Sequence, residues 1–177
     1  LLNADFVNAI ESMDGVTGIK RWYYTDAEYR VNDYDDNWIY GLAKEDVSAL
    51  KENLIAGTVD YHELVSKNGI ILIQDTAENL SLSAQLGDSV EVDFLTKSGK
   101  TITKSYTIMG IVSNFNHPAF NMCFAMPAEL MNEACEMDCS GTISVIMEPD
   151  KADTIEASLN QLIDGNSDLV MDTIEES

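Results

Sequence analysis

The sequence predicts an α+β protein in which helices pack on one face of a sheet, in two layers. The two ends of the chain alternate amphipathic helical stretches with short strands, whereas the middle is mostly strand and turn. The chain has 177 residues, 45% of them hydrophobic, which is enough for a core. We therefore expect a discontinuous αβ subdomain, 1–65 with 119–177, and an inserted β-rich subdomain, 66–118.

The first third of the chain predicts helices and strands around one acidic loop. Apolar residues recur at helical spacing over 3–13 and end before Gly15, a residue that commonly stops helices. The segments expected after this helix are a β-rich stretch over 16–31, an acidic loop over 33–37, a short strand over 38–42 and a helix over 44–54.

The middle of the chain predicts a β-hairpin. Val90, Val92 and Phe94 alternate with polar residues, which is the period-two pattern of a half-buried strand. The sequence KSGK at 97–100 supplies the turn, in which Gly99 can take the positive φ of a short hairpin loop. A buried strand over 69–74 and a helical turn over 76–83 precede this hairpin.

Three residues near the hairpin are expected to shape the backbone rather than to form a site. Gly87 permits a tight turn, and the side chain of Asp88 can cap the backbone of the same turn. Gly110 lies inside an apolar strand, where glycine indicates a bulge or a close backbone approach.

The last third returns to alternating strands and helices. Pro118 and its polar neighbours predict a loop over 114–118, and Pro127 suits the first turn of a helix that ends near 135. The other expected elements are strands over 121–125, 142–147 and 169–171, and a helix that follows Pro149.

The net charge of −21 limits the possible partners. An acidic surface repels phosphate backbones and anionic lipid headgroups, so nucleic acid is excluded as a partner. Cationic peptides and metal cations are electrostatically compatible, although the same charge also serves solubility.

The acidic loop carries the candidate partner surface. Asp33, Asp35 and Asn37 match the first three ligand positions of a calcium loop, but Trp38 stands where the tight turn needs glycine. A calcium hand is therefore excluded, and either a looser cation site or a solvated loop beside aromatic residues remains. The residues that we expect to contact a partner are Asp33, Tyr34, Asp35, Asp36 and Trp38.

The cysteines and histidines provide no recognisable metal site. Cys123, Cys135 and Cys139, taken with His117, match no common zinc spacing, so we favour buried or partly exposed thiols and leave a local disulfide open. The other histidine, His62, has no nucleophile motif beside it, and no phosphate-binding glycine motif occurs. We therefore expect no catalytic residues, no metal, no cofactor and no enzymatic activity.

Several segments together resemble the extracytoplasmic core domain of MacB/FtsX-like ABC transporter permeases. They are NGIILIQ at 68–74, LGDSV at 86–90, YTIMGIV at 106–112, FAMPAEL at 124–130, and the strand and helix over 143–162. The resemblance covers roughly the last two-thirds of the chain and consists of hydrophobic patterns rather than chemical motifs. It implies a porter-like αβ subdomain with an inserted β-rich subdomain, and it supplies no catalytic residues.

The resemblance also implies a location and partners. Such a domain lies outside the cell membrane between two transmembrane helices, and it couples ATP hydrolysis by a cytoplasmic ATPase subunit to export or handling of a peptide, lipoprotein or drug. A second permease copy, and an extracellular peptide or accessory protein, are further implied partners. The chain lacks an initial Met, and its apolar runs, such as 70–73, are far too short to span a bilayer, which we interpret as an excised outer domain. The alternative is a free-standing secreted domain that binds a cationic peptide or sugar.

Overall fold

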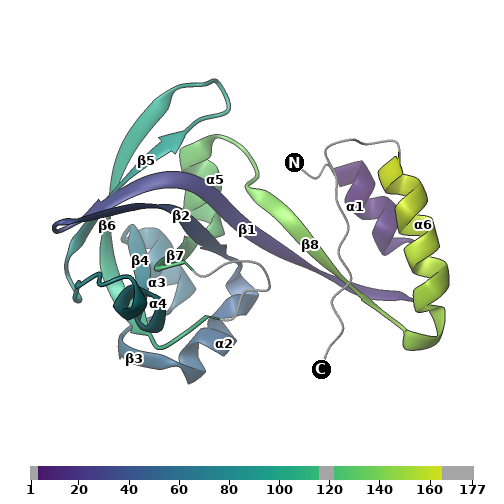
Figure 1. The fold of residues 1–177 in the computed structure, drawn as a ribbon, viewed down its shortest axis with the longest axis horizontal. Helices are drawn as coiled ribbons and strands as arrows, with labels where there is room; N and C mark the ends of the chain where they lie inside the picture. The colour runs from purple at the N-terminus through teal and green to yellow at the C-terminus, as the bar shows by residue number, and fades with distance from the viewer. Residues whose placement is uncertain (1–3, 116–121, 165–177) are drawn as a thin grey trace. The chain divides into compact units, whose positions relative to one another are not determined.

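The computed structural model describes residues 4–115 and 122–164, which form an α+β fold (Figure 1). The chain divides into two compact units, a central unit, Trp22–Gly141, and an end unit that joins Leu1–Arg21 with Thr142–Ser177. The strands are β1 (Val16–Val31), β2 (Tyr34–Leu42), β3 (Leu54–Gly57), β4 (Gly69–Ile73), β5 (Ser89–Leu95), β6 (Thr101–Val112), β7 (Phe124–Pro127) and β8 (Ser140–Met147).

Six strands of the central unit pair into a closed ring. β1 pairs with β2, β2 with β7, and β7 with β4. β4 then pairs with β6, β6 with β5, and β5 returns to β1. The β2–β7 and β4–β6 pairs are parallel, and the other four are antiparallel. Each of these strands therefore has a hydrogen-bonded neighbour on both sides.

The two faces of the ring bury different hydrophobic clusters. Along β4, Ile70 and Leu72 belong to one cluster, whereas Ile71 and Ile73 belong to the other, because successive side chains of a strand point to opposite faces. The first cluster, here called the inner cluster, contains residues from all six strands of the ring. Within it, the rings of Tyr29 and Phe124 meet edge to face, with their centroids 5.0 Å apart.

Helices of the central unit contribute to both clusters, whereas the sequence predicted helices on one face of the sheet. α4 and α5 supply residues to the inner cluster, and α2 and α3 supply residues to the second, outer cluster. The helices of the central unit are α2 (Val47–Glu52), which follows a short 3-10 helix, Lys44–Asp46, and α3 (Tyr61–Ser66), α4 (Gln74–Asn79) and α5 (Ala128–Cys135).

The end unit has a small hydrophobic cluster of its own. α1 (Ala4–Glu11) and α6 (Ala152–Asp164) lie side by side in Figure 1, and Ile10 packs with Ile155 and Leu159 between them. A 3-10 helix, Pro149–Lys151, precedes α6. The side chain of Lys151 forms an ion pair with Asp14 at 3.1 Å, which joins the end of α1 to the start of α6.

The strand 16–31, the hairpin of β5 and β6, and the turn-forming residues are confirmed. Gly87 has a φ of 88°, and the carboxylate of Asp88 accepts a hydrogen bond from the backbone N–H of Gln85 at 3.0 Å. Gly99 has a φ of 86° in the hairpin turn. A side chain at Gly110 would collide with the backbone carbonyl of Thr58, so the expected close approach is also present.

Two expectations for the first half of the central unit are wrong. The segment 34–37 is part of β2 rather than an acidic loop, because pairing with β1 extends to the hairpin tip. The helix expected over 44–54 ends at Glu52, and Leu54 begins strand β3, which pairs with β6. The sequence also did not predict α3. Most of the expected loop 114–118, and the strand 169–171, lie outside the described residues.

The expected insert, 66–118, shares its sheet with the flanking parts of the chain. It contributes β4, β5 and β6 to the ring, and the flanks contribute β1, β2 and β7. The boundaries between the two compact units lie after Arg21 and after Gly141. The subdomain boundaries expected from the sequence stay a prediction.

Candidate functional site

The acidic segment forms the tip of the β1–β2 hairpin. Val31 pairs with Tyr34, so Asn32 and Asp33 make a two-residue turn, in which Asn32 has a φ of 53°. Asparagine tolerates this left-handed conformation better than most residues. Asp33 and Asp35 are exposed, which places two carboxylates at the tip where a partner can reach them.

Trp38, the fifth residue expected in the partner surface, is separated from the tip by a β-bulge. Thr25 pairs with Ile39 and Glu28 pairs with Asn37, so two residues of β1 lie opposite Trp38 alone. Trp38 has a φ of 74°, which is rare for a bulky residue. Its half-buried indole packs against the outer cluster, so Trp38 is part of the packing as well as of the surface.

A shallow cavity of about 260 Å³ lies beside the tip. It brings together residues 28–30 of β1 and 35–37 of β2, because the two strands of the hairpin run side by side. Asp35 and Asp36 come from the segment expected in the sequence, whereas Arg30 and its neighbours were not expected. The lining residues are Glu28, Tyr29, Arg30, Asp35, Asp36 and Asn37.

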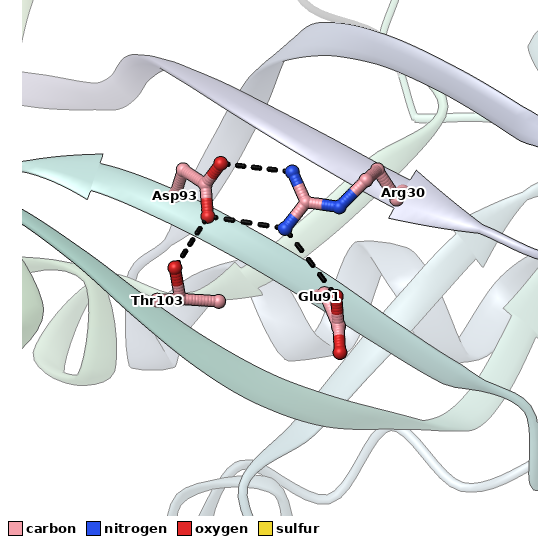
Figure 2. A network of polar contacts seen from close by, with 4 residues as sticks. All are labelled: Arg30, Glu91, Asp93 and Thr103. Carbon is pink, nitrogen blue, oxygen red and sulfur yellow. Dashed lines mark hydrogen bonds and ion pairs between the residues drawn. The ribbon is translucent and has the colours of Figure 1, made fainter.

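Arg30 is tied to the neighbouring strand by a network of charged side chains. Figure 2 shows its guanidinium between two carboxylates of β5, with Nη1 2.8 Å from Oδ2 of Asp93 and Nη2 3.3 Å from Oε2 of Glu91. Thr103 of β6 donates a further hydrogen bond to Oδ1 of Asp93 at 2.6 Å. The guanidinium of Arg30 is therefore paired with carboxylates of β5. The three other charged residues that line the cavity, Glu28, Asp35 and Asp36, are acidic.

The network shifts the pKa values of its members. Hydrogen bonds from Arg30 and then Thr103 lower the pKa of Asp93 to about 2. The hydrogen bond with Asp93 in turn raises the pKa of Arg30 above its ordinary value. Both groups therefore carry their charges throughout the physiological range.

Two phenols, one buried and one half-buried, and a buried thiol lie next to the cavity. The hydroxyl of Tyr34 donates a hydrogen bond to Oδ2 of Asp36 at 2.7 Å, and burial with this bond raises the pKa of Tyr34. Burial also raises the pKa of Tyr29, whose hydroxyl is hydrogen-bonded to the thiol of Cys123. Burial raises the pKa of Cys123 as well, so this thiol stays protonated and is a poor nucleophile.

The described residues contain no group of three or more His, Cys, Asp or Glu side chains placed to hold a metal ion. Cys123, Cys135 and Cys139 are all buried, as expected for thiols of the core. His117 lies outside the described residues, and His62 lies on the exposed face of α3. The cavity thus offers hydrogen-bond acceptors and negative charge for a cationic group.

The lining residues that the sequence did not predict follow from the register of the hairpin. Arg30 pairs with Asp35, and Glu28 pairs with Asn37, because the turn occupies only two residues. Predicting a two-residue turn at Asn32 and Asp33 would have given this register and therefore both pairs. The acidic loop expected over 33–37 implied no pairing between these residues.

The α+β fold is that of the extracytoplasmic domains of MacB-like ABC-type transporters, which confirms the resemblance seen in the sequence at the level of the fold. One similar solved structure is the extracellular domain of the noncanonic ABC-type transporter YknZ from Gram-positive bacteria. It is 15% identical, with a TM-score of 0.56, and the match covers 93% of this chain and 83% of that one. Another is the periplasmic region of MacB from Actinobacillus actinomycetemcomitans, with 14% identity and a TM-score of 0.51. That match covers 93% of this chain and 74% of that one.

No protein-family model matches the sequence, and no curated protein matches it either. Within residues 4–115 and 122–164, no helix combines the length and the apolar character needed to cross a membrane.

Proposed function

We propose that this chain is the extracytoplasmic domain of an ABC transporter permease subunit. The domain is non-catalytic and lies between two transmembrane helices of the same permease. It couples ATP hydrolysis by a cytoplasmic ATPase subunit to the export or handling of a peptide, lipoprotein or drug outside the membrane. A second permease copy completes the transporter, and the domain consists of a porter-like αβ subdomain, 1–65 with 119–177, and an inserted β-rich subdomain, 66–118.

One observation carries this proposal. The similarity to the extracellular domain of YknZ extends over 93% of this chain, so it includes both compact units rather than one common motif. The described residues also lack a metal-binding cluster, and the cavity beside the hairpin tip presents mainly carboxylates. The free-standing secreted domain is not favoured, because the fold is that of transporter domains.

The reading frame that encodes this chain provides the test. We expect one membrane span before Leu1, three after Ser177, and an ATPase gene beside it. With the complete permease and ATPase in membrane vesicles, we expect deletion of residues 22–141 to abolish coupled transport while the spans still insert. A reading frame with a signal peptide and no spans would refute the proposal.

We further propose that the hairpin tip is the partner surface of this domain, through Asp33, Tyr34, Asp35 and Asp36 with Trp38 behind them. Its exposed carboxylates and the cavity beside them favour a cationic segment of a peptide or accessory protein. An oligolysine peptide is a suitable probe, measured by calorimetry at low salt.

A matched pair of variants separates this surface from the general charge of the molecule. We expect the triple change of Asp33, Asp35 and Asp36 to Asn to weaken binding of the peptide about tenfold or more, as for loss of about 1.4 kcal/mol. The control changes Glu52, Glu129 and Glu133, three exposed helical carboxylates, to Gln. Equal weakening in both variants would show that the tip has no special role.

A further inference from the structure

Cys135 and Cys139 lie on either side of a tight turn between α5 and β8. Cys135 is the last residue of α5, and Glu136 after it has the left-handed φ of 57° that commonly ends helices. The backbone N–H of Met137 donates to the carbonyl of Asn132 at 3.2 Å, which closes the turn. The chain therefore folds back within four residues and brings the second cysteine towards the first.

Further hydrogen bonds hold both cysteines in place. The backbone N–H of Cys139 donates to Oδ1 of Asn132 at 2.8 Å. The carbonyl of Cys135 accepts a hydrogen bond from the backbone N–H of Lys97 at 3.0 Å. Both side chains are buried in the inner cluster, with exposures of 1% and 4%. The turn and the surrounding core thus hold the backbone of both cysteines and restrict their side chains.

The two thiols influence each other's protonation, and Sγ of Cys139 lies 3.8 Å from the carbonyl oxygen of Met137. Hydrogen bonding between the thiols lowers the pKa of Cys135 and raises that of Cys139. Oγ1 of Thr25 lies 3.9 Å from Sγ of Cys135 and supports the same shift. Because the thiolate is the attacking species in disulfide exchange, Cys135 is the nucleophile of this pair.

We propose that Cys135 and Cys139 form an intramolecular disulfide that joins the end of α5 to the start of β8. Cys123 stays outside the pair, because its thiol is hydrogen-bonded to the hydroxyl of Tyr29 instead. Two buried cysteines four residues apart, on a turn held by hydrogen bonds at both ends, need only a local rearrangement of that turn to reach disulfide geometry.

The oxidant is a small-molecule disulfide. The thiolate of Cys135 attacks one of its sulfur atoms and expels one thiolate, which leaves a mixed disulfide on the protein. Cys139 loses its proton and attacks Sγ of Cys135, which expels the second thiolate. The protein thus loses two electrons and two protons, and the small molecule is reduced to two thiols. Because both cysteines are buried, the small molecule reaches Cys135 through a local opening that exposes its sulfur atom while the turn persists.

The biological setting of this disulfide rests on the proposed function. An extracytoplasmic domain lies in an oxidising compartment, where disulfides form and persist. The pairing itself depends only on the turn, so it is tested on the purified chain without a membrane or an ATPase. If the disulfide does not form, the transporter proposal still stands. If the transporter proposal fails, the disulfide can still form.

The test counts thiols and maps the bond. The chain is equilibrated with oxidised glutathione, denatured and alkylated, and then digested and analysed by mass spectrometry. We expect one alkylated cysteine, Cys123, and one peptide in which Cys135 and Cys139 are joined. The sample reduced before alkylation is expected to show three alkylated cysteines.

Two variants serve as controls. Cys123→Ser is expected to leave no alkylated cysteine after oxidation, and Cys139→Ser is expected to leave Cys135 alkylated or bound to glutathione. The proposal is overturned if the oxidised wild-type chain keeps three alkylated cysteines, or if Cys123 is found in the bond. The wild-type map decides the matter even where a variant does not fold.

Discussion

Arg30 binds Asp93 diagonally across the β1–β5 pair. In the register, Arg30 lies opposite Glu91, whereas Asp93 lies opposite Glu28. The guanidinium nevertheless makes two hydrogen bonds to Asp93, at 2.8 and 3.1 Å, and a longer one to Glu91 at 3.3 Å. Two parallel hydrogen bonds fix the orientation of an arginine better than a single contact does.

This relationship predicts how the carboxylate of Asp93 titrates. Its pKa is about 2, below the ordinary value of 3.8, because Arg30 stabilises the charged form. We expect Arg30→Met to raise the pKa of Asp93 towards 3.8, and Thr103→Val to raise it by a smaller amount. The carboxyl carbon signal of Asp93, followed by NMR from pH 5 to pH 1.5, measures both shifts.

The sign of the effect on stability follows from the lowered pKa. A carboxylate whose pKa is depressed by folding adds stability above its unfolded value, and this is lost as the pH falls through the folded value. We therefore expect the difference in Tm between the wild type and Asp93→Asn to shrink between pH 4 and pH 2. A difference that stays constant over this range would contradict the assignment.

The contact between Phe124 and Tyr29 predicts a large loss of stability when Phe124 is truncated. Phe124 is fully buried in the inner cluster, and its ring meets that of Tyr29 edge to face. We expect Phe124→Ala to lower the free energy of unfolding by about 3–5 kcal/mol, as for other buried aromatic residues. Urea titration measures this change. Leu95→Ala is the control, because Leu95 is 63% exposed and its loss is expected to change stability by less than about 0.5 kcal/mol.

The close approach at Gly110 predicts that even a methyl group destabilises β6. An added Cβ would overlap the carbonyl of Thr58, which is backbone and cannot move aside easily. We expect Gly110→Ala to lower the free energy of unfolding by about 1–3 kcal/mol. In Gly18→Ala the nearest atom is Cδ1 of Ile146 at 3.6 Å, so that variant should unfold much like the wild type in the same titration.

The cap of α3 predicts a smaller effect. Oδ1 of Asp60 accepts a hydrogen bond from the backbone N–H of Glu63 at 2.9 Å, which satisfies one free donor of the first turn. We expect Asp60→Ala to lower the free energy of unfolding by about 1 kcal/mol, whereas Asp60→Asn keeps an oxygen at the same place and retains most of it. Equal losses in the two variants, measured by thermal unfolding, would contradict a capping role.

The elements predicted correctly are those for which the local sequence pattern favours the same structure that the tertiary contacts require. The alternation of Val90, Val92 and Phe94 predicted β5, and the turn residues Gly87, Asp88 and Gly99 predicted where strands begin and turn. These signals are local. They depend on the period of the strand and on the φ values that glycine permits.

The strand segments that the sequence did not predict depend on pairing with neighbouring strands. β3 is a strand because β6 lies beside it, and the four residues Leu54–Gly57 have no period of their own. The carboxylates at 35 and 36 are poor strand formers, but β1 extends to the tip and supplies their partners. The cavity was missed for the same reason, because Arg30 reaches it only through that register.

The closed ring also has a consequence for solubility. A sheet that ends in a long free strand offers unpaired N–H and C=O groups to other chains, and such edges nucleate aggregates. In the ring, each of the six strands pairs on both sides with neighbours within the same chain, over two or three residues at the shortest contacts. Strand addition at these paired stretches therefore requires that the ring first open, and the net charge of −21 keeps opened molecules apart.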